Sequence, residues 1–289
     1  MSIKPNFLGI GAPKCGTTWL ANLLSVHPEV FMADAKELLY FSDRNHLGER
    51  WYLDHFATAA GKKAIGEFSV NYMHHSQVPA GRILAFDPDI KMIAVLRDPV
   101  RRAFSHYRWL QQMGKLERTL SFVEAANTHE DILGYSFYHR NLRAFLDNFD
   151  RQNLHVIMYE DIEARPEQVQ RDVFRFLSVN DSFETRFTKK VVGKTITPRS
   201  QVLERLRIKI YAAARRHGHQ SLIAFVKRTG FSQLYRKIND KGSNKKILPR
   251  GAYEVIAERF VGDVDDLRRT LNIPCDNWLS QNITTGGQR

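Results

Sequence analysis

A short loop near the N-terminus combines glycine, lysine and threonine residues at spacings that suit phosphate binding. Residues 11–19 read Gly-Ala-Pro-Lys-Cys-Gly-Thr-Thr-Trp and follow a short apolar segment at 7–10. Gly16 lets the backbone curl, so that loop amides and the N-terminus of the next helix can point at an anion. Lys14 and the two threonine hydroxyls supply further donors. The pattern therefore predicts a phosphate-binding loop.

This loop differs from the loop of nucleoside triphosphatases and kinases. Gly11 and Gly16 have the separation required by the pattern G-x-x-x-x-G-K-[ST], but Thr17 and Thr18 follow them and the lysine lies inside the loop. The apolar segment 91–96 is followed by an arginine, Arg97, where a magnesium-binding carboxylate would be needed. A P-loop nucleotide kinase is thus disfavoured, although it stays an alternative.

The elements that position these residues alternate along the chain. Apolar runs predict strands over 7–11, 63–67, 91–96 and 155–159, and helical patterns cover 19–24, 100–110, 121–127, 137–149 and 167–177. Such alternation favours a mostly parallel central sheet with helices on both faces, an α/β, P-loop-like three-layer fold. At 289 residues, we expect one domain over 1–289.

Positive charge is concentrated late in the chain. The net charge is +12, and residues 186–250 contain eighteen Lys or Arg against two acids, so this segment carries +16 and the remainder about −4. Helical patterns cover 202–238 in this basic segment, and an amphipathic helix is expected over 250–271. Such a segment attracts a phosphorylated cofactor, an acidic glycan, nucleic acid or an anionic membrane, or it only keeps the surface soluble.

Several classes of protein are disfavoured by composition. No run of eighteen apolar residues and no secretory signal pattern is present, so we expect a cytoplasmic protein without a membrane span. The two cysteines, Cys15 and Cys275, suit neither a disulfide framework nor a cysteine-based zinc site, and no HExxH pattern occurs. We therefore expect no metal.

Two motifs resemble those of a known family. Residues 13–20, Pro-Lys-Cys-Gly-Thr-Thr-Trp-Leu, resemble the 5′-phosphosulfate loop of sulfotransferases that use 3′-phosphoadenosine 5′-phosphosulfate (PAPS). Residues 97–107, Arg-Asp-Pro-Val-Arg-Arg-Ala-Phe-Ser-His-Tyr, resemble the 3′-phosphate motif of that family. Further matches at Glu37, at 159–161 and at Trp278 extend the resemblance over most of the chain. It is closest to the carbohydrate (heparan-sulfate-type) and bacterial branch.

The resemblance implies PAPS as co-substrate and 3′-phosphoadenosine 5′-phosphate (PAP) as product. Arg97 and Ser105 would hold the 3′-phosphate, a task for which a guanidinium backed by a hydroxyl is suited. Trp19 matches a position that stacks on adenine in some members, but it is equally suited to the core. The full set of expected donor contacts is Lys14, Cys15, Gly16, Thr17, Thr18, Trp19, Arg97, Ser105, Tyr159, Lys245 and Lys246.

The resemblance also implies a catalytic base. The carbohydrate branch uses a glutamate in a string of the form Lys-Glu-x-x-(aromatic)-Phe, and residues 36–41 read Lys-Glu-Leu-Leu-Tyr-Phe. We therefore expect Glu37 to act as general base, Lys36 to tune it, and Lys14 to stabilise the leaving phosphate. His74 and His75 are the competing candidates.

The acceptor is less well defined. Phe68 stands where the carbohydrate branch commonly has a lysine, which weakens the case for a highly anionic glycosaminoglycan. We expect a hydroxyl or amine of a carbohydrate, glycolipid or other small acceptor, with possible contact to an anionic membrane through the basic segment. A nucleic-acid-binding protein is the alternative of a different class, but it leaves both phosphate motifs unexplained.

Overall fold

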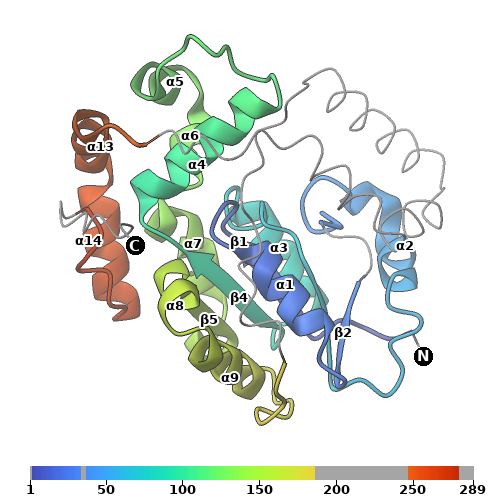
Figure 1. Cartoon of the computed structure of the whole chain (residues 1–289). Coiled ribbons are helices and arrows are strands. Elements are labelled where there is room, and N and C mark those ends of the chain that lie inside the picture. Colours follow the sequence, from blue (N-terminus) through green and yellow to red (C-terminus); the bar gives the residue numbers. More distant parts are fainter. Residues whose placement is uncertain (1, 34–36, 186–246, 280–289) are drawn as a thin grey trace, which may run out of the picture.

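A five-stranded parallel sheet forms the centre of the molecule. The computed structural model describes residues 2–33, 37–185 and 247–279, and its strands lie in the order β2-β3-β1-β4-β5 (Figure 1). All four strand pairings are parallel. The strands are β1 (Phe7–Gly11), β2 (Val30–Met32), β3 (Ala64–Phe68), β4 (Lys91–Leu96) and β5 (Leu154–Met158). The predicted α/β fold with a parallel sheet is confirmed.

The central strands are apolar because helices cover both faces of the sheet. Every residue of β1 and β3 is buried, as expected for parallel strands inside an α/β domain. Close approach of these strands requires glycine at Gly66, where an added Cβ would lie 2.3 Å from the carbonyl oxygen of Phe7. Gly66 thus allows close approach of β1, which leads to the predicted loop, and β3, which ends at Phe68.

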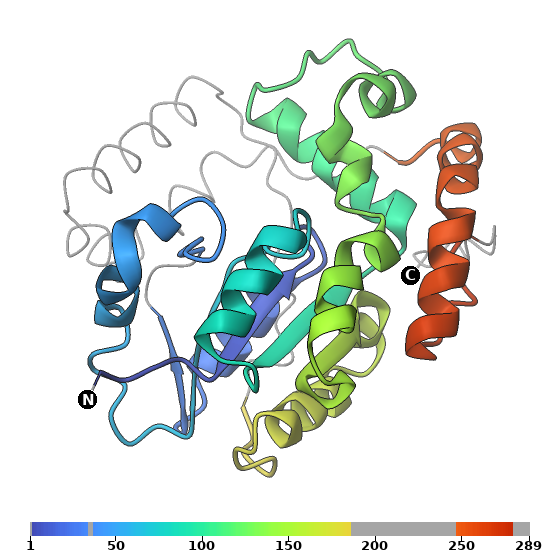
Figure 2. The same ribbon diagram turned by 180° about the vertical axis from the view of Figure 1, so that it is seen from behind.

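Helices form the two outer layers. The two opposite views show α1 on one face of the sheet and α3 and α7 on the other (Figures 1 and 2). The C-terminal helices pack on α7 and on α4 and α5, beyond the β4 side of the sheet. The helices are α1 (Thr17–Ser25), α2 (Gly48–Asp54), α3 (Gln77–Phe86), α4 (Pro99–Gln112), α5 (Phe122–Thr128), α6 (Glu130–Gly134), α7 (Tyr138–Asn148), α8 (Tyr159–Ala164), α9 (Pro166–Phe176), α13 (Arg250–Ala257) and α14 (Val261–Leu271).

The single helix expected over 250–271 is wrong. A 3-10 turn at Glu258–Phe260 separates α13 from α14. The turn places Phe260 fully in the core, where its ring lies 4.9 Å from that of Phe137. Gly262, the second residue of α14, has low helix propensity, which disfavours one continuous helix here. The amphipathic pattern was correct for both halves, since each buries one apolar side.

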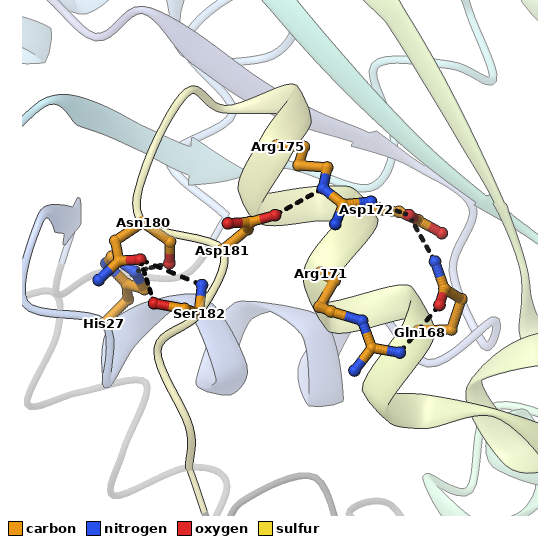
Figure 3. Close-up of polar contacts among 8 residues, drawn as sticks. All are labelled: His27, Gln168, Arg171, Asp172, Arg175, Asn180, Asp181 and Ser182. Atoms are coloured by element: carbon orange, nitrogen blue, oxygen red, sulfur yellow. Dashed lines mark hydrogen bonds and ion pairs between the residues drawn. The ribbon is translucent and has the colours of Figure 1, made fainter.

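A polar cluster fastens the end of α9 to the connection between α1 and β2 (Figure 3). His27 Nδ1 accepts a hydrogen bond from the Glu29 amide at 3.1 Å, so its Nε2 carries the proton and donates to the Asn180 carbonyl at 3.0 Å. The Asn180 amide donates in turn to the Glu29 carboxylate at 2.7 Å. These contacts fix the start of β2, at the end of the sheet opposite to the predicted loop. They do not involve the loop itself.

The basic segment lies largely outside the described residues. Its helical pattern over 202–238 and the lysines Lys245 and Lys246 fall between 185 and 247 and therefore remain predictions. Lys36 likewise falls outside the described chain. Among the helices that are described, none has the length and apolar character needed to span a lipid bilayer.

Candidate active site

The predicted site residues gather at one edge of the sheet. In parallel strands the carboxyl ends share an edge, and here that edge receives the loop after β1, Phe68 from β3, Arg97 after β4 and Tyr159 after β5. The chain leaves β1 toward β2 and β3 on one side and returns to β4 on the other. This reversal of strand order is where open α/β sheets bind ligands.

The loop between β1 and α1 has the conformation of an anion cradle. Lys14 and Gly16 both have left-handed backbone angles, with φ of 70° and 90°, and Gly16 is the residue that caps the start of α1. The first helical amides therefore face out of the loop without a side-chain cap, as anion sites at helix N-termini require. Thr17 is buried and Thr18 is exposed.

Tyr138 ties the loop to the end of β4. The Tyr138 hydroxyl donates to the carbonyl oxygen of Arg97 at 2.8 Å and lies 3.7 Å from Cys15 Sγ. Burial raises the pKa of the Cys15 thiol to about 11, which keeps it neutral. Cys15 thus packs beneath the loop as a small buried side chain, and any contribution to donor binding comes through its backbone.

Arg97 lies against the loop and against Tyr159. Its guanidinium sits 4.3 Å from the centre of the Tyr159 ring, and its Nη1 lies 3.5 Å from the Lys14 carbonyl oxygen. Tyr159 also borders Gly16, where an added Cβ would come within 3.1 Å of the ring. Arg97 Nε is buried and has no hydrogen-bond partner within the described chain. Arg97 therefore keeps one donor that no group of the described chain uses.

The start of α4 is held from two sides. Asp98 accepts from the Arg101 amide at 2.8 Å as the N-cap of α4, and from the Tyr253 hydroxyl of α13 at 2.7 Å. The Asp98 amide donates to Glu160 at 3.1 Å. Ser105 lies on the same helix and is half-buried. Arg97 and Ser105 therefore belong to one rigid strand–helix unit.

Glu37 reaches the same edge by another route. Its amide donates to the carbonyl oxygen of Phe68 at 3.0 Å, which places it at the carboxyl end of β3, beside β1. The residue is half-buried. Burial is the main cause of the raised pKa values of Glu67 and Tyr135, and the charge of Glu37 adds a small part to both. The structure thus brings the expected base to the edge that carries the loop.

The two competing histidines differ in their surroundings. His74 is buried, stacks on Tyr135 at 4.0 Å, and neither ring nitrogen has a hydrogen-bond partner in the described chain. Burial lowers the pKa of His74 to about 4, so its ring is a weak base. His75 is exposed. Both follow Met73, whose amide donates to the Ile10 carbonyl oxygen of β1 at 3.0 Å, so they too lie near this edge, and His74 is disfavoured by its weak basicity and not by its position.

Trp19 lies in the hydrophobic core. Only 3% of its surface is exposed, so its ring offers little area to an adenine. Of the two roles that suited the sequence, the structure shows the one in the core. A contact between Trp19 and the nucleotide stays a prediction.

Other polar groups at this edge were not expected from the sequence. Arg102 is wholly buried, donates to Ser136 Oγ at 2.6 Å and to the Ile132 carbonyl oxygen, and contacts His106 Nδ1 at 3.2 Å. Burial and the Arg102 charge lower the pKa of His106 to about 3. Trp109 lies 5.7 Å from Lys14 Nζ. Ser136 and Ile132, which accept from Arg102, are 34 and 30 residues away in sequence, so no local pattern signals these two contacts.

The fold is shared with solved sulfotransferase structures. A sulfotransferase from Alicyclobacillus acidocaldarius superposes with a TM-score of 0.69 over 96% of this chain and 100% of that one, at 24% identity. A family model described as a sulfotransferase domain matches residues 4–197. The chain therefore belongs to the sulfotransferase family.

Relatives with known names cover only parts of this chain. A membrane-associated sulfotransferase, kil1, of Dictyostelium discoideum is 32% identical over 136 residues, which is 45% of this chain and 29% of that protein. The heparan sulfate glucosamine 3-O-sulfotransferase 3B1 of Mus musculus is 30% identical over 185 residues, 61% of this chain and 46% of that protein. The matched region thus spans less than half the length of either relative.

Proposed function

We propose that this chain transfers the sulfuryl group of PAPS to a hydroxyl or amine of a carbohydrate or glycolipid. The observation that carries the proposal is the contact of Arg97 with both the loop and Tyr159. Through it, the two phosphate motifs form a single site. A ligand with a 5′-phosphosulfate and a 3′-phosphate carries anionic groups at both positions.

The loop and the arginine divide the donor between them. Lys14, Thr17, Thr18 and the amides at the start of α1 would hold the phosphosulfate, and Lys14 would stabilise charge on the departing phosphate oxygen. Arg97 and Ser105 would hold the 3′-phosphate. Lys245 and Lys246 would add to that side, as the family resemblance implies.

Glu37 would take the proton from the acceptor. As the acceptor oxygen or nitrogen forms a bond to sulfur, the bond from sulfur to the phosphate oxygen breaks and PAP leaves. The position of Glu37 at the carboxyl end of β3 supports this role. The buried, weakly basic His74 is less suited to it.

The acceptor class rests on the relatives. The name of the mouse protein gives heparan sulfate glucosamine as its substrate, and we propose a sugar hydroxyl or amine here. Phe68 is 1% exposed and adds no positive charge at the end of β3. A neutral or modestly charged sugar therefore fits this part of the site better than a polyanion.

The proposal is tested by separating chemistry from donor binding. Transfer of labelled sulfate from PAPS would be followed with glucosamine, a heparan oligosaccharide, galactosylceramide vesicles and 4-nitrophenol, and PAP affinity by calorimetry. Glu37→Gln should lower turnover by about 100-fold or more while PAP affinity stays unchanged, because only the base is lost. Lys14→Ala should reduce both.

Either of two results would overturn it. Near-normal turnover of Glu37→Gln would remove Glu37 as the base and direct attention to His74 or His75. Unchanged PAP affinity of Lys14→Ala would show that the loop does not hold the donor.

A further inference from the structure

Glu67 is a buried acid in the middle of the sheet. It lies on β3 opposite Leu8 of β1 and is 1% exposed. No ion pair joins it to a basic side chain in the described part of the chain. A buried carboxylate without a cation must be satisfied by hydrogen bonds, and the partners of Glu67 are all hydroxyl or amide groups.

The hydrogen bonds of Glu67 form two parallel arms. Ser69 Oγ donates to Oε2 at 2.8 Å, and Tyr72 Oη donates to Oε1 at 2.9 Å. Each hydroxyl also accepts from a backbone amide: Ser69 from Leu39 at 2.9 Å, and Tyr72 from Phe41 at 3.3 Å. The Leu38 amide provides a further hydrogen bond to the carboxylate.

These arms end on the segment that carries Glu37. Residues 37–41 are neither helix nor strand, and both Glu37 and Leu39 have left-handed backbone angles, with φ of 65° and 57°. Such angles are unfavourable for residues with a side chain and persist only where the surroundings fix them. Three amides of this segment depend on Glu67: that of Leu38 directly, and those of Leu39 and Phe41 through the Ser69 and Tyr72 hydroxyls.

We propose that Glu67 is a positioning residue, whose ionised carboxylate holds segment 37–41 through the Ser69 and Tyr72 hydroxyls and thereby fixes the place of Glu37. This inference rests on the proposed role of Glu37 as base. An ionised carboxylate accepts both hydroxyl protons, and each hydroxyl keeps a lone pair for its backbone amide. A glutamine amide or a protonated carboxyl at position 67 presents an N–H or O–H donor to one of these hydroxyls. That hydroxyl can then no longer both donate to residue 67 and accept from its backbone amide, so one arm is lost.

The ionised form of Glu67, which holds both arms, prevails above about pH 7, so the arrangement belongs to neutral and alkaline pH. Burial raises the pKa of Glu67 to about 7, the charge of Glu37 adds to the rise, and the hydrogen bonds from Ser69, Tyr72 and Leu38 oppose it. Tyr52 lies close enough for Glu67 to raise its pKa, but the Tyr52 hydroxyl has no hydrogen-bond partner among the described residues. Tyr52 therefore belongs to the same cluster without belonging to either arm.

The first test is amide hydrogen exchange of the peptide that contains residues 37–41. Glu67→Gln should accelerate exchange there by roughly tenfold or more, because several amides lose fixed partners. Ser69→Ala and Tyr72→Phe, which each cut one arm, should do so to a smaller degree and keep the proposal testable if Glu67→Gln fails to fold. Tyr52→Phe is the matched control and should leave exchange unchanged.

The second test separates positioning from general stability. Turnover is measured with whichever acceptor of the panel the wild type sulfates fastest. Glu67→Gln should lower kcat about 10- to 100-fold, and its PAP affinity should stay within twofold of wild type. In a Glu37→Gln background the same substitution should cause no further loss, because it acts through Glu37.

The outcomes are distinguishable. Unchanged exchange in Glu67→Gln, or a full additional loss of kcat in the Glu37→Gln background, would overturn the positioning role. Normal turnover of Glu37→Gln alone would instead overturn the proposed base, while accelerated exchange in Glu67→Gln would still show that Glu67 holds the segment.

Discussion

At the scale of residues, Gly16 and Arg97 carry the proposed donor site. The helix N-terminus at Gly16 offers amides to one anion, and the guanidinium of Arg97, stacked on Tyr159, is available to a second. Glycine at position 16 serves two needs at once, because φ is 90° there and an added Cβ would lie only 3.1 Å from the Tyr159 ring. Two anion-binding positions on one edge, as we propose, would distinguish this loop from a simple phosphate cradle.

Arg97→Lys tests the second anionic position. A lysine lacks the planar fork and the stacked face of the guanidinium, so we expect PAP affinity to fall roughly 10- to 100-fold, as for the loss of a charged hydrogen bond. Affinity for AMP, which lacks the 3′-phosphate, should change little. Calorimetric titration of both nucleotides measures the difference.

Arg101→Lys is the matched control. Arg101 is the exposed arginine four residues further on, at the start of α4. Arg101→Lys should leave the affinities for PAP and for AMP unchanged. An equal loss of AMP and PAP affinity in Arg97→Lys would contradict a role specific to the 3′-phosphate.

At the scale of elements, the sequence predicted the strands and helices that carry the phosphate motifs. Periodicity alone located β4 over Lys91–Leu96 and the helix that Pro99 begins. It missed β2, which has only three residues, and α3, which contains Pro79 and Gly81 and so reads as a break. Short or interrupted elements form because tertiary packing overrides local propensity.

The same limit applies to the candidate site. Gly16, Arg97 and Glu37 were found because they belong to local motifs. Tyr138 was not, because the Arg97 carbonyl that it binds is 41 residues away. Glu67 was not, because the amides that its neighbours Ser69 and Tyr72 hold are 30 and 31 residues from those neighbours. Their roles depend on strand order, which a single sequence does not reveal.

Asp98 links the helices around the site, and its loss should be unusually costly. Asp98→Ala removes the N-cap of α4 and leaves the buried Tyr253 hydroxyl without its partner. We expect a decrease of about 2–4 kcal/mol in the free energy of unfolding. Urea denaturation provides the measurement.

Ser121→Ala offers the comparison for Asp98→Ala. Ser121 caps α5 in an exposed capping box and holds no second element. It should cost about 1 kcal/mol. Equal costs for the two substitutions would show that the Tyr253 contact contributes nothing.

For the whole molecule, buried titratable groups make stability depend on pH. The pKa of Glu67 is about 7 in the folded protein, above its ordinary value of 4.5. Between these values the folded state holds a proton that the unfolded state has released, so stability falls as pH rises from about 4.5 to about 7. The contribution is on the order of 3 kcal/mol.

Two histidines contribute with the opposite sign. Burial lowers the pKa values of His74 and His106 to about 4 and about 3, so acid protonates them in the unfolded state first and stability falls as pH drops below about 6.5. The contribution of Glu67 is isolated by subtracting the unfolding curves of Glu67→Gln from those of wild type at pH 5 to 8. A pH-independent difference would contradict a raised pKa at Glu67.

We propose that one edge of the sheet binds a nucleotide through both its 5′- and its 3′-phosphate. The most direct measurement is calorimetric titration of the unaltered chain with PAP, with AMP and with ATP in the presence of magnesium. PAP should bind roughly 10- to 100-fold more tightly than AMP, because only PAP engages Arg97 and Ser105 as well as the loop. Equal affinities for PAP and AMP, or stronger binding of magnesium ATP than of PAP, would contradict the account.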